Sequence, residues 1–552
     1  MESIESEGKC KVMFVDDDPQ VGVDWKEILE PRGYEVIVAQ GEGQSLIEDA
    51  RALAREERPH VIIVDLRLKS EEPNNLQGLE LLEEFPVPYI LYSAYLDDAE
   101  LLRRVNDEHE KFIWVKKTGS PRQLLEDIER LTGPNCQARR KLNIQRLREF
   151  RSEMIVKTLF PQEETVPPRL VDDLLCQLFP NTNQLELIHI DNQVRTPATP
   201  RTVSRGRSIV LRVQPNTMES VVVKLAAAEH IDREYKNHKR YVDGKLGGSF
   251  YPQLRRAGRF WELGASCYTF FSSAEGSRQL FSAFYHTENE SDRLLRPIEY
   301  FCQNVWPYYR ENASLLQVPL FVEYDQKLQL EQRLRKLDTR HEQRSFAAIP
   351  HALPNPVRWV LSHKEQCVLP NVKATVVHGD LHGDNLFVDG EHAWPIDFER
   401  TGPSHKLRDF AELEVDILTR LLVVTQADLL SFYHLALTVA HHPQADHYNS
   451  AQLERRFPLL SRWQPSAKMQ KALGIIAGIR RLAHSLYNYA TPEEYLWAVL
   501  LTALFTATLH PRGDLQREQA LLLASVICQR LRTGARNWPP VDWLQLEQGG
   551  IT

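Results

Sequence analysis

Apolar runs alternate with amphipathic stretches along the first 132 residues of the chain. Runs of strand length, rich in β-branched and aromatic residues, cover 11–15, 35–39, 61–66, 89–93 and 112–115. Stretches with apolar residues at helical spacing follow them, at 21–30, 44–57, 78–84, 97–106 and 121–131. Five such repeats with short connections predict an α/β fold, a doubly wound sheet of five parallel strands with helices on both faces.

Polar side chains lie at the carboxyl ends of these predicted strands, the edge at which doubly wound sheets bind ligands. They are Asp16 and Asp17 after the first strand, Asp65 in the third, Ser93 in the fourth and Lys116 after the fifth. Converging carboxylates repel one another unless a cation lies among them. With Mg²⁺ bound there, Asp65 could attack a phosphoryl donor while Lys116 offsets charge on the product. The alternative is a set of solvated side chains with no shared role.

Residues 9–132 resemble the receiver domain of two-component response regulators. The segments VMFVDDDP, VIIVDLRL, ILYSAY and FIWVKKTGSP carry the resemblance. It implies a metal-binding pair at Asp16 and Asp17, a phosphoacceptor at Asp65, a switch hydroxyl at Ser93 and the site lysine at Lys116. It also implies a partner, a sensor histidine kinase or a phosphotransfer protein, that phosphorylates Asp65.

Several positions depart from the receiver pattern. Arg67 follows closely after Asp65, where its charge would affect the lifetime of a phosphoryl group, and the segment 65–78 is longer than usual. Ile113 stands where an aromatic switch residue is common, and Lys117 stands where proline is frequent. We therefore expect a site that can be phosphorylated, but whose structural response to phosphorylation differs from that of a typical receiver.

A connector follows at 133–165. Gly133-Pro134-Asn135 punctuates the end of the receiver-like segment, and residues 137–160 read as an Arg-rich helix with an imperfect apolar stripe. We expect this helix to pack between domains or to pair with a second copy of the chain in a homodimer. A solvated basic helix with no signalling role is the alternative.

The motif HGDLHGDN at 378–385 is followed eleven residues later by IDFE at 396–399. Two carboxylates and a carboxamide at this spacing are typical of ATP-dependent phosphoryl transfer. Asp380 would orient an attacking hydroxyl, while Asn385 and Asp397 would hold Mg²⁺ against the nucleotide phosphates. The alternative is a polar turn between two strands.

A strand lysine and a helix glutamate precede this motif. The β-rich run 221–225 contains Lys224, and a buried lysine needs an anionic partner. Glu234 shares a helical face with Ile231 and His238 in the stretch that follows, whereas Glu229 lies off that face. An ordinary edge-strand lysine is the alternative for Lys224.

The segment 204–208 lies where a kinase covers the nucleotide phosphates with a glycine loop. Gly206 is its one glycine, so few backbone N–H groups can approach a phosphate closely. Arg205 or Arg207 would compensate through charge. This loop is the weakest element of the predicted ATP site.

Residues 166–552 resemble the aminoglycoside phosphotransferase and choline kinase branch of the kinase-like fold. The segments HGDLHGDN, PIDFE, VVVKLA and REYKNH carry the resemblance. It implies a two-lobed α+β domain, with an N-lobe at 166–275 and a large helical C-lobe at 276–552 that contains an acceptor-pocket insertion. The implied roles are Asp380 as base, Asn385 and Asp397 as Mg²⁺ ligands, Gly206, Lys224 and Glu234 as the ATP-binding set, His378 as a loop brace and Asp409 as a structural acid.

Composition narrows the setting of these sites. The net charge is −8, and acidic and basic residues are both abundant, so the composition does not indicate a nucleic-acid-binding protein. The seven cysteines are scattered and never closely paired, which argues against a disulfide framework and a zinc site. The acidic N-terminus lacks the features of a signal peptide, and the longest apolar run, 495–509, is shorter than a membrane span. We expect a cytoplasmic protein.

These features predict a phosphorelay signal-transduction protein. A receiver phosphorylated on Asp65 would regulate an ATP-dependent phosphotransferase that acts on a hydroxyl of an unidentified small molecule or protein, with Mg²⁺ at both sites. Two other functions stay open. In one, a catalytically weak kinase-like scaffold binds nucleotide or a partner under receiver control, as the thin glycine loop favours. In the other, the receiver only recruits the chain to a sensor kinase.

Overall fold

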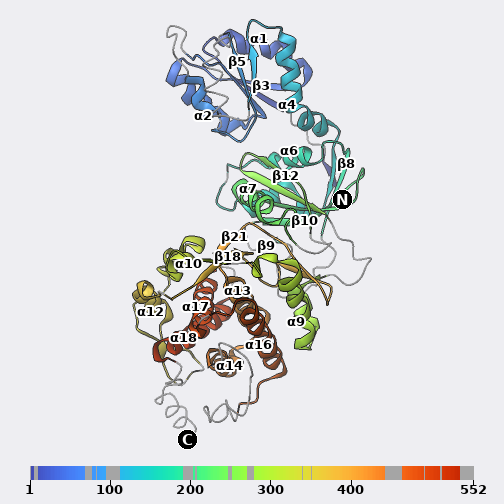
Figure 1. Cartoon of the computed structure of the whole chain (residues 1–552). Coiled ribbons are helices and arrows are strands. Elements are labelled where there is room, and N and C mark those ends of the chain that lie inside the picture. The colour runs from blue at the N-terminus through green and yellow to red at the C-terminus, as the bar shows by residue number, and fades with distance from the viewer. Residues whose placement is uncertain are drawn as a thin grey trace. The chain divides into compact units, whose positions relative to one another are not determined.

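The protein is seen in a computed structural model that describes most of the chain (Figure 1). The described residues are 2–4, 10–68, 77–94, 112–189, 203–204, 208–246, 252–269, 279–441, 463–509 and 513–534, apart from 83, 164, 312, 338, 339, 348, 350, 368 and 490. Gly206 and the helix predicted over 97–106 lie outside them. The chain divides into two compact units, the first formed by 1–191, 198–233 and 253–270, and the second by 192–197, 234–252 and 271–552.

The first unit begins with a five-stranded parallel sheet in the order β3-β2-β4-β5-β6. Its strands are β2 (Cys10–Val15), β3 (Tyr34–Val38), β4 (Val61–Val64), β5 (Tyr89–Ser93) and β6 (Phe112–Lys116). Between them lie the helices α1 (Pro19–Leu29), η1 (Glu30–Arg32), α2 (Gly43–Glu57) and η2 (Gln77–Leu81), and α4 (Pro121–Lys141) follows β6. This doubly wound sheet confirms the predicted fold.

Helices cover both faces of this sheet (Figure 1). On one face, Trp25 of α1 and Leu124 of α4 pack with Phe14 of β2. On the other, Leu46 of α2 packs with Met13. Alternate residues of a strand point to opposite faces, so β2 is buried along its whole length and is apolar from Val12 to Val15.

The connector differs from its prediction. Instead of one helix over 137–160, the chain ends α4 at Lys141 and forms β7 (Asn143–Arg146), η3 (Arg148–Phe150) and α5 (Ser152–Leu159). Leu142, Ile144 and Arg146 are buried and alternate with more exposed neighbours. That period of two favours a strand over a helix, but it is too short to stand out in an Arg-rich segment.

Strand β7 joins the mixed sheet of the N-lobe, whose order is β1-β7-β8-β10-β11-β13-β12, with β9 also paired to β10. The strands are β1 (Glu2–Ile4), β8 (Gln184–Ile188), β9 (Val203–Ser204), β10 (Ser208–Pro215), β11 (Val221–Ala227), β12 (Leu254–Phe260) and β13 (Leu263–Thr269). Helix α6 (Arg169–Leu178) packs against β12 and β13, and α7 (Ala228–Asn237) follows β11. Strand β11 lies between β10 and β13, so Lys224 is on an inner strand rather than an edge strand.

Within the first unit, the receiver-like sheet contacts the β12–β13 hairpin. The guanidinium of Arg58 binds the carboxylate of Glu262 at 2.9 Å, and Nε1 of Trp261 donates to the carbonyl of Pro59 at 3.1 Å. Buried His60 lies 3.6 Å from Asp173 of α6. These contacts attach the start of β4, the strand that leads to Asp65, to the N-lobe.

The second unit is mostly helical. Its helices are η4 (His238–Val242), α8 (Phe281–Thr287), α9 (Ser291–Tyr300), η6 (Phe301–Val305), η7 (Pro307–Tyr309), α10 (Leu320–Leu328), α11 (Leu330–Leu334), α12 (Pro356–His363), η8 (Lys364–Gln366), α13 (Arg408–Asp416), η9 (Ile417–Leu421), η10 (Gln426–Asp428), α14 (Leu429–His441), α16 (Ala467–Tyr487), α17 (Pro492–Ala507) and α18 (Asp514–Thr533). Three small antiparallel sheets accompany them, β14-β19-β20, β15-β18-β21 and β16-β17. Their strands are β14 (Gln279–Leu280), β15 (Ser314–Leu315), β16 (Gln343–Arg344), β17 (Leu353–Pro354), β18 (Lys373–Val377), β19 (Leu386–Val388), β20 (Ala393–Pro395) and β21 (Gly402–His405). This unit is the helical lobe that the sequence predicts.

A buried ion pair fixes the centre of the helical lobe. Arg480 of α16 and Glu414 of α13 are both fully buried and lie 2.5 Å apart, and the hydroxyl of Tyr495 on α17 donates to Glu414 at 2.9 Å. Removing one partner of such a pair leaves an uncompensated charge, so the contact holds α13 firmly in place. In the described part of the chain, no helix combines the length and apolar character needed to cross a membrane.

The cysteines of the described residues are of two kinds. Cys10 at the start of β2 takes part in a disulfide bond. Cys176, Cys267, Cys302, Cys367 and Cys528 are free and buried. A single cross-link in a chain of this length does not make a disulfide framework.

Candidate functional site

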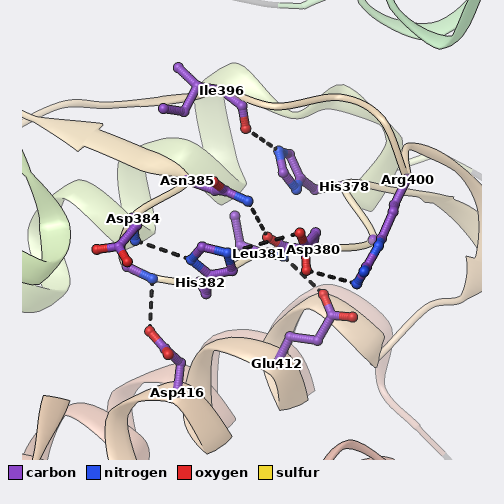
Figure 2. Close-up of polar contacts among 12 residues, drawn as sticks. His378, Asp380, Leu381, His382, Asp384, Asn385, Ile396, Arg400, Glu412 and Asp416 are labelled. Carbon is purple, nitrogen blue, oxygen red and sulfur yellow. Dashed lines mark hydrogen bonds and ion pairs between the residues drawn. The ribbon is translucent and has the colours of Figure 1, made fainter. Parts of the chain in front are cut away.

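The HGDLHGDN motif forms a loop between β18 and β19, next to helix α13 (Figure 2). Gly379 has a φ of 78°, and a Cβ at this position would lie 2.4 Å from the carbonyl oxygen of Arg400. Only glycine fits a positive φ together with so close an approach of backbone. Glycine at position 379 therefore allows the backbone of Arg400 to pack directly against the loop.

The carboxylate of Asp380 points to two basic side chains (Figure 2). Arg400 lies 3.0 Å from Oδ1, and Nε2 of His382 lies 3.9 Å from Oδ2. Partial burial disfavours the charged form, but Arg400, with His382 and His378, outweighs it and lowers the pKa of Asp380 to about 2. Asp380 is therefore ionised at neutral pH and can accept a hydrogen bond from a hydroxyl.

The two residues expected to bind metal are brought together by the β19–β20 hairpin. The backbone N–H of Ile396 donates to the carbonyl of Asn385 at 3.0 Å, which places Asp397 one residue beyond that contact. The amide nitrogen of Asn385 donates to the carbonyl of Asp380 at 2.9 Å. An amide that donates through its nitrogen presents Oδ1 as an acceptor, the oxygen ligand that Mg²⁺ prefers. Asn385 thus fits the role of a metal ligand.

His378 is buried at the start of the loop. Its Nε2 lies 2.9 Å from the carbonyl of Ile396, and its ring packs against Phe398 and Trp306. Burial lowers the pKa of His378, which favours the neutral ring. The contact ties the loop to the segment that carries Asp397.

The same segment is bound from the other side by the end of α7 and by η4. The amide of Asn237 donates to the carbonyl of Glu399 at 2.7 Å. The ring of His238 meets the ring of Phe398 edge-on, with centroids 5.5 Å apart. Burial lowers the pKa of His238 to about 4. The IDFE segment is thus held between two buried histidines, His238 and His378.

The remaining ATP-site residues lie in separate units or outside the described residues. Lys224 is buried in β11 of the first unit, and Glu234 is buried in α7 in the part assigned to the second unit. Their pairing stays a prediction. Gly206 lies outside the described residues.

Asp409, the expected structural acid, lies buried on α13 beneath the loop. Its two carboxylate oxygens accept the backbone N–H groups of His378 and Gly379 at 2.7 and 2.8 Å. The hydroxyl of Tyr309 also donates to it. Hydrogen bonds from N–H groups to a carboxylate are strong, so Asp409 holds the start of the loop in place.

Sequence reasoning missed several side chains of this site. They are Arg400, Glu412, Asp416 and Arg420. The helical spacing of Asp409, Glu412 and Asp416 within the predicted helical C-lobe was a signal for Glu412 and Asp416.

The receiver-like sheet gathers a second acidic site at its carboxyl edge. Ligand oxygens of Asp16, Asp17 and Asp65 lie within 4.8 Å of one another. Burial, with a smaller contribution from Asp65, raises the pKa of Asp16 to about 6. Crowded carboxylates repel one another, and a divalent cation among them would offset that repulsion.

A lysine that the sequence does not single out contacts this acidic site. The ammonium of Lys117 lies 2.5 Å from Asp65 and 2.6 Å from Asp16. The sequence marks Lys117 only as a replacement for proline, so its contact with both carboxylates is a finding of the structure. The role expected of Lys116, the last residue of β6, stays a prediction.

Two more residues complete this edge. Ser93 is fully buried at the end of β5, and its carbonyl accepts the backbone N–H of Lys117 at 3.0 Å. Gly78 lies against Asp65, because a Cβ there would lie 2.0 Å from the Asp65 carbonyl. The expected switch residue is thus adjacent to the lysine that contacts the expected phosphoacceptor.

Residues 323–510 match the family model described as ternary complex associated domain 9. No curated protein matches the chain. Among solved structures, the chemotaxis protein CheY4 of Vibrio cholerae is similar at 21% identity and a TM-score of 0.18, over 22% of this chain and 99% of that one.

Two solved kinases are similar to a larger part of the chain. An aminoglycoside-3'-phosphotransferase of type VIII matches at 15% identity and a TM-score of 0.33, over 61% of this chain and 99% of that one. An ethanolamine kinase of Plasmodium vivax matches at 13% identity and a TM-score of 0.32, over 70% and 96%. The chain is thus similar to a receiver at its N-terminus and to aminoglycoside phosphotransferase and choline kinase-like enzymes over the rest.

Proposed function

We propose that the chain is a signal-transduction protein in which a receiver regulates an ATP-dependent phosphotransferase acting on a hydroxyl of a small molecule or protein. The observation that carries this proposal is the hydrogen bond from the Asn385 amide to the Asp380 carbonyl, 2.9 Å long, beside the hairpin that brings Asp397 to Asn385. It supports the proposal because the residues proposed as base and as metal ligands, Asp380, Asn385 and Asp397, then belong to one small structure.

In the proposed reaction, Asp380 accepts a hydrogen bond from the acceptor hydroxyl and orients its oxygen toward the γ-phosphorus of ATP. The new O–P bond forms as the bond to the bridging oxygen breaks, ADP leaves, and the hydroxyl proton passes to Asp380. Asn385 and Asp397 would hold Mg²⁺, which neutralises phosphate charge when bound. Lys224, paired with Glu234, would bind the phosphates.

The test uses the full chain with Mg-ATP and a panel of hydroxyl-bearing acceptors, with transfer followed from γ-labelled ATP. Asp380→Asn should lower turnover by about 100-fold or more while Mg-ATP still binds. Asp389→Asn is the matched control, because the carboxylate of Asp389 contacts the turn of the same hairpin, through the N–H groups of Glu391 and His392 and the ring of His392. Turnover that persists in Asp380→Asn would rule out the assignment.

For the receiver, we propose that Asp65 is the phosphoacceptor, with Asp16 and Asp17 as further Mg²⁺ ligands and a sensor histidine kinase or phosphotransfer protein as donor. Lys116 and Lys117 would offset the charge of the phosphoryl group, and Ser93 would bind one of its oxygens. Incubation with acetyl phosphate should label the wild type and not Asp65→Ala. Equal labelling of both would show that Asp65 is not the acceptor.

One observation favours the second candidate, a scaffold that binds nucleotide without transfer. Arg400 already occupies the Asp380 carboxylate at 3.0 Å. If this pair persists with nucleotide bound, Asp380 cannot receive a hydroxyl. Calorimetric binding of Mg-ATP without transfer to any acceptor, both before and after receiver phosphorylation, would support the scaffold.

A further inference from the structure

Helix α13 presents three carboxylates to the HGDLHGDN loop. Asp409, Glu412 and Asp416 are spaced i, i+3 and i+7, so they lie on one face of the helix. Glu414, between them in sequence, forms the buried pair with Arg480 and anchors the helix in the lobe. The helix is therefore a fixed support for whatever its carboxylate face binds.

Each of these carboxylates accepts backbone N–H groups of the loop. Beside the two that Asp409 accepts, Glu412 accepts the N–H of Leu381 at 2.9 Å and Asp416 accepts that of Gly383 at 2.9 Å (Figure 2). Hydrogen bonds from N–H groups to a carboxylate are stronger than those between neutral groups. The loop is thus held at several points along its backbone, and not only at Asp409.

Two arginines complete the arrangement. Nε of Arg408 binds Oε1 of Glu412 at 2.9 Å, and its Nη2 donates to the carbonyl of Gly379 at 2.6 Å. Arg420 binds both Asp416 and Asp384, at 2.6 and 2.9 Å. Glu412 and Asp416 therefore have cationic partners of their own, which offset the cost of holding charge away from water.

The position of Glu412 has a specific consequence for Asp380. The peptide that joins Asp380 to Leu381 is planar, and both of its polar ends are bound. Its N–H is held by Glu412, and its carbonyl is held by the amide of Asn385 at 2.9 Å. Rotation of this one peptide would move the base and a metal ligand together.

We propose that Glu412 is a positioning residue that fixes the Asp380–Leu381 peptide and thereby aligns the base with the metal ligand Asn385. Glu412 itself touches neither the acceptor hydroxyl nor the nucleotide in this role. The inference rests on the proposed phosphotransferase function, which supplies the reaction that the alignment serves.

The test compares Glu412→Ala with Glu412→Gln in the full chain. Alanine removes the acceptor for the Leu381 N–H, whereas glutamine keeps an acceptor oxygen with the same reach. We expect Glu412→Ala to lower kcat for hydrolysis of Mg-ATP, with water as acceptor, by about 10- to 100-fold while KM for Mg-ATP changes less. Glu412→Gln should restore most of kcat.

Amide hydrogen exchange gives a second readout that needs no turnover. Glu412→Ala should speed exchange in the segment 378–386, and Glu412→Gln should not. Glu494→Gln is the control, since Glu494 is a buried glutamate paired with His405 at 3.1 Å and far from the loop in sequence. It should lower stability without a selective effect on that segment.

The outcomes separate the two proposals. Unchanged exchange at 378–386 in Glu412→Ala, or equal kcat losses in Glu412→Ala and Glu412→Gln at equal stability, would overturn the positioning role. Hydrolysis that does not depend on Asp380 would instead overturn the phosphotransferase assignment, while the exchange result still decides whether Glu412 holds the loop.

Discussion

The guanidinium of Arg400 lies 3.0 Å from Oδ1 of Asp380, so the proposed base has a cationic partner within the protein itself. The same residue contributes the carbonyl oxygen that requires glycine at position 379. Arg400 therefore shapes the loop through its backbone and the charge of Asp380 through its side chain.

Replacing Arg400 with glutamine should shift the pH dependence of turnover. The pKa of Asp380 is lowered from 3.8 to about 2 because Arg400 and nearby histidines outweigh the effect of burial. Without Arg400 this pKa rises, so the acid limb of the rate profile should move up by about 1 unit. The profile of kcat against pH measures this shift.

Arg296→Gln is the control, because Arg296 forms an exposed surface pair with Glu391. It should leave the acid limb in place. An acid limb that is the same in Arg400→Gln and the wild type would mean that Arg400 does not set the charge of Asp380.

Much of the fold could be predicted from sequence because its signals are local. The apolar runs of strand length defined β2 to β6, and the strand ends then located Asp16, Asp17 and Asp65. Strand β7 was missed because its alternation spans only a few residues of an Arg-rich segment.

Two features of the sites depend on side-chain direction, which sequence does not give. Consecutive residues at the end of a strand point in different directions, so the sequence does not show that Lys117 contacts the acidic edge. Glu412 lies on a helix that is remote from the motif in sequence. Its spacing from Asp409 could suggest a shared helical face, but its contact with the Leu381 N–H is seen only in the packing of α13 beneath the loop.

Removing the Lys117 ammonium should strengthen Mg²⁺ binding at the receiver site. Lys117 lies within 2.6 Å of both Asp16 and Asp65 and offsets their repulsion. In Lys117→Ala the two carboxylates face each other without that charge, so their affinity for Mg²⁺ should rise by about tenfold or more. Isothermal titration with Mg²⁺ measures the change.

The surface variant Lys26→Ala is a control with the same change of net charge, because Lys26 pairs with Glu30 on the half-exposed face of α1. It should alter Mg²⁺ affinity much less, since an exposed charge is screened by solvent. Equal effects of the two variants would contradict a direct action of Lys117 on the carboxylates.

Gly379→Ala should disable the loop, since the new Cβ would lie 2.4 Å from the carbonyl of Arg400 at a φ of 78°. We expect a loss of roughly 2 to 3 kcal/mol in unfolding free energy and a strong drop in turnover. Gly390→Ala distinguishes the cost of a positive φ from the cost of a steric clash. Gly390 has a φ of 98°, but a Cβ added to it would meet no atom within 4 Å. It should cost about 1 kcal/mol and spare turnover. Urea unfolding and kcat test both variants, and equal losses would contradict the role of the Arg400 carbonyl.

Acid should destabilise the contact between His238 and Phe398. Burial lowers the pKa of His238 from 6.5 to about 4, so the unfolded chain binds a proton that the folded chain excludes between these values. Stability should therefore fall as pH drops from about 6.5 toward 4, by on the order of 3 kcal/mol from this group.

His238→Phe keeps a ring against Phe398 but removes the titration. Its unfolding free energy, measured in urea at pH 7.5 and pH 5, should fall less on acidification than that of the wild type. His189→Gln changes a histidine that is 38% exposed, and it should follow the wild type at both pH values. If His238→Phe loses as much unfolding free energy between pH 7.5 and pH 5 as the wild type, protonation of His238 is not the cause of the loss. Because the ring of His238 packs on the residue next to Asp397, its protonation at low pH would also loosen the segment that is proposed to bind the metal.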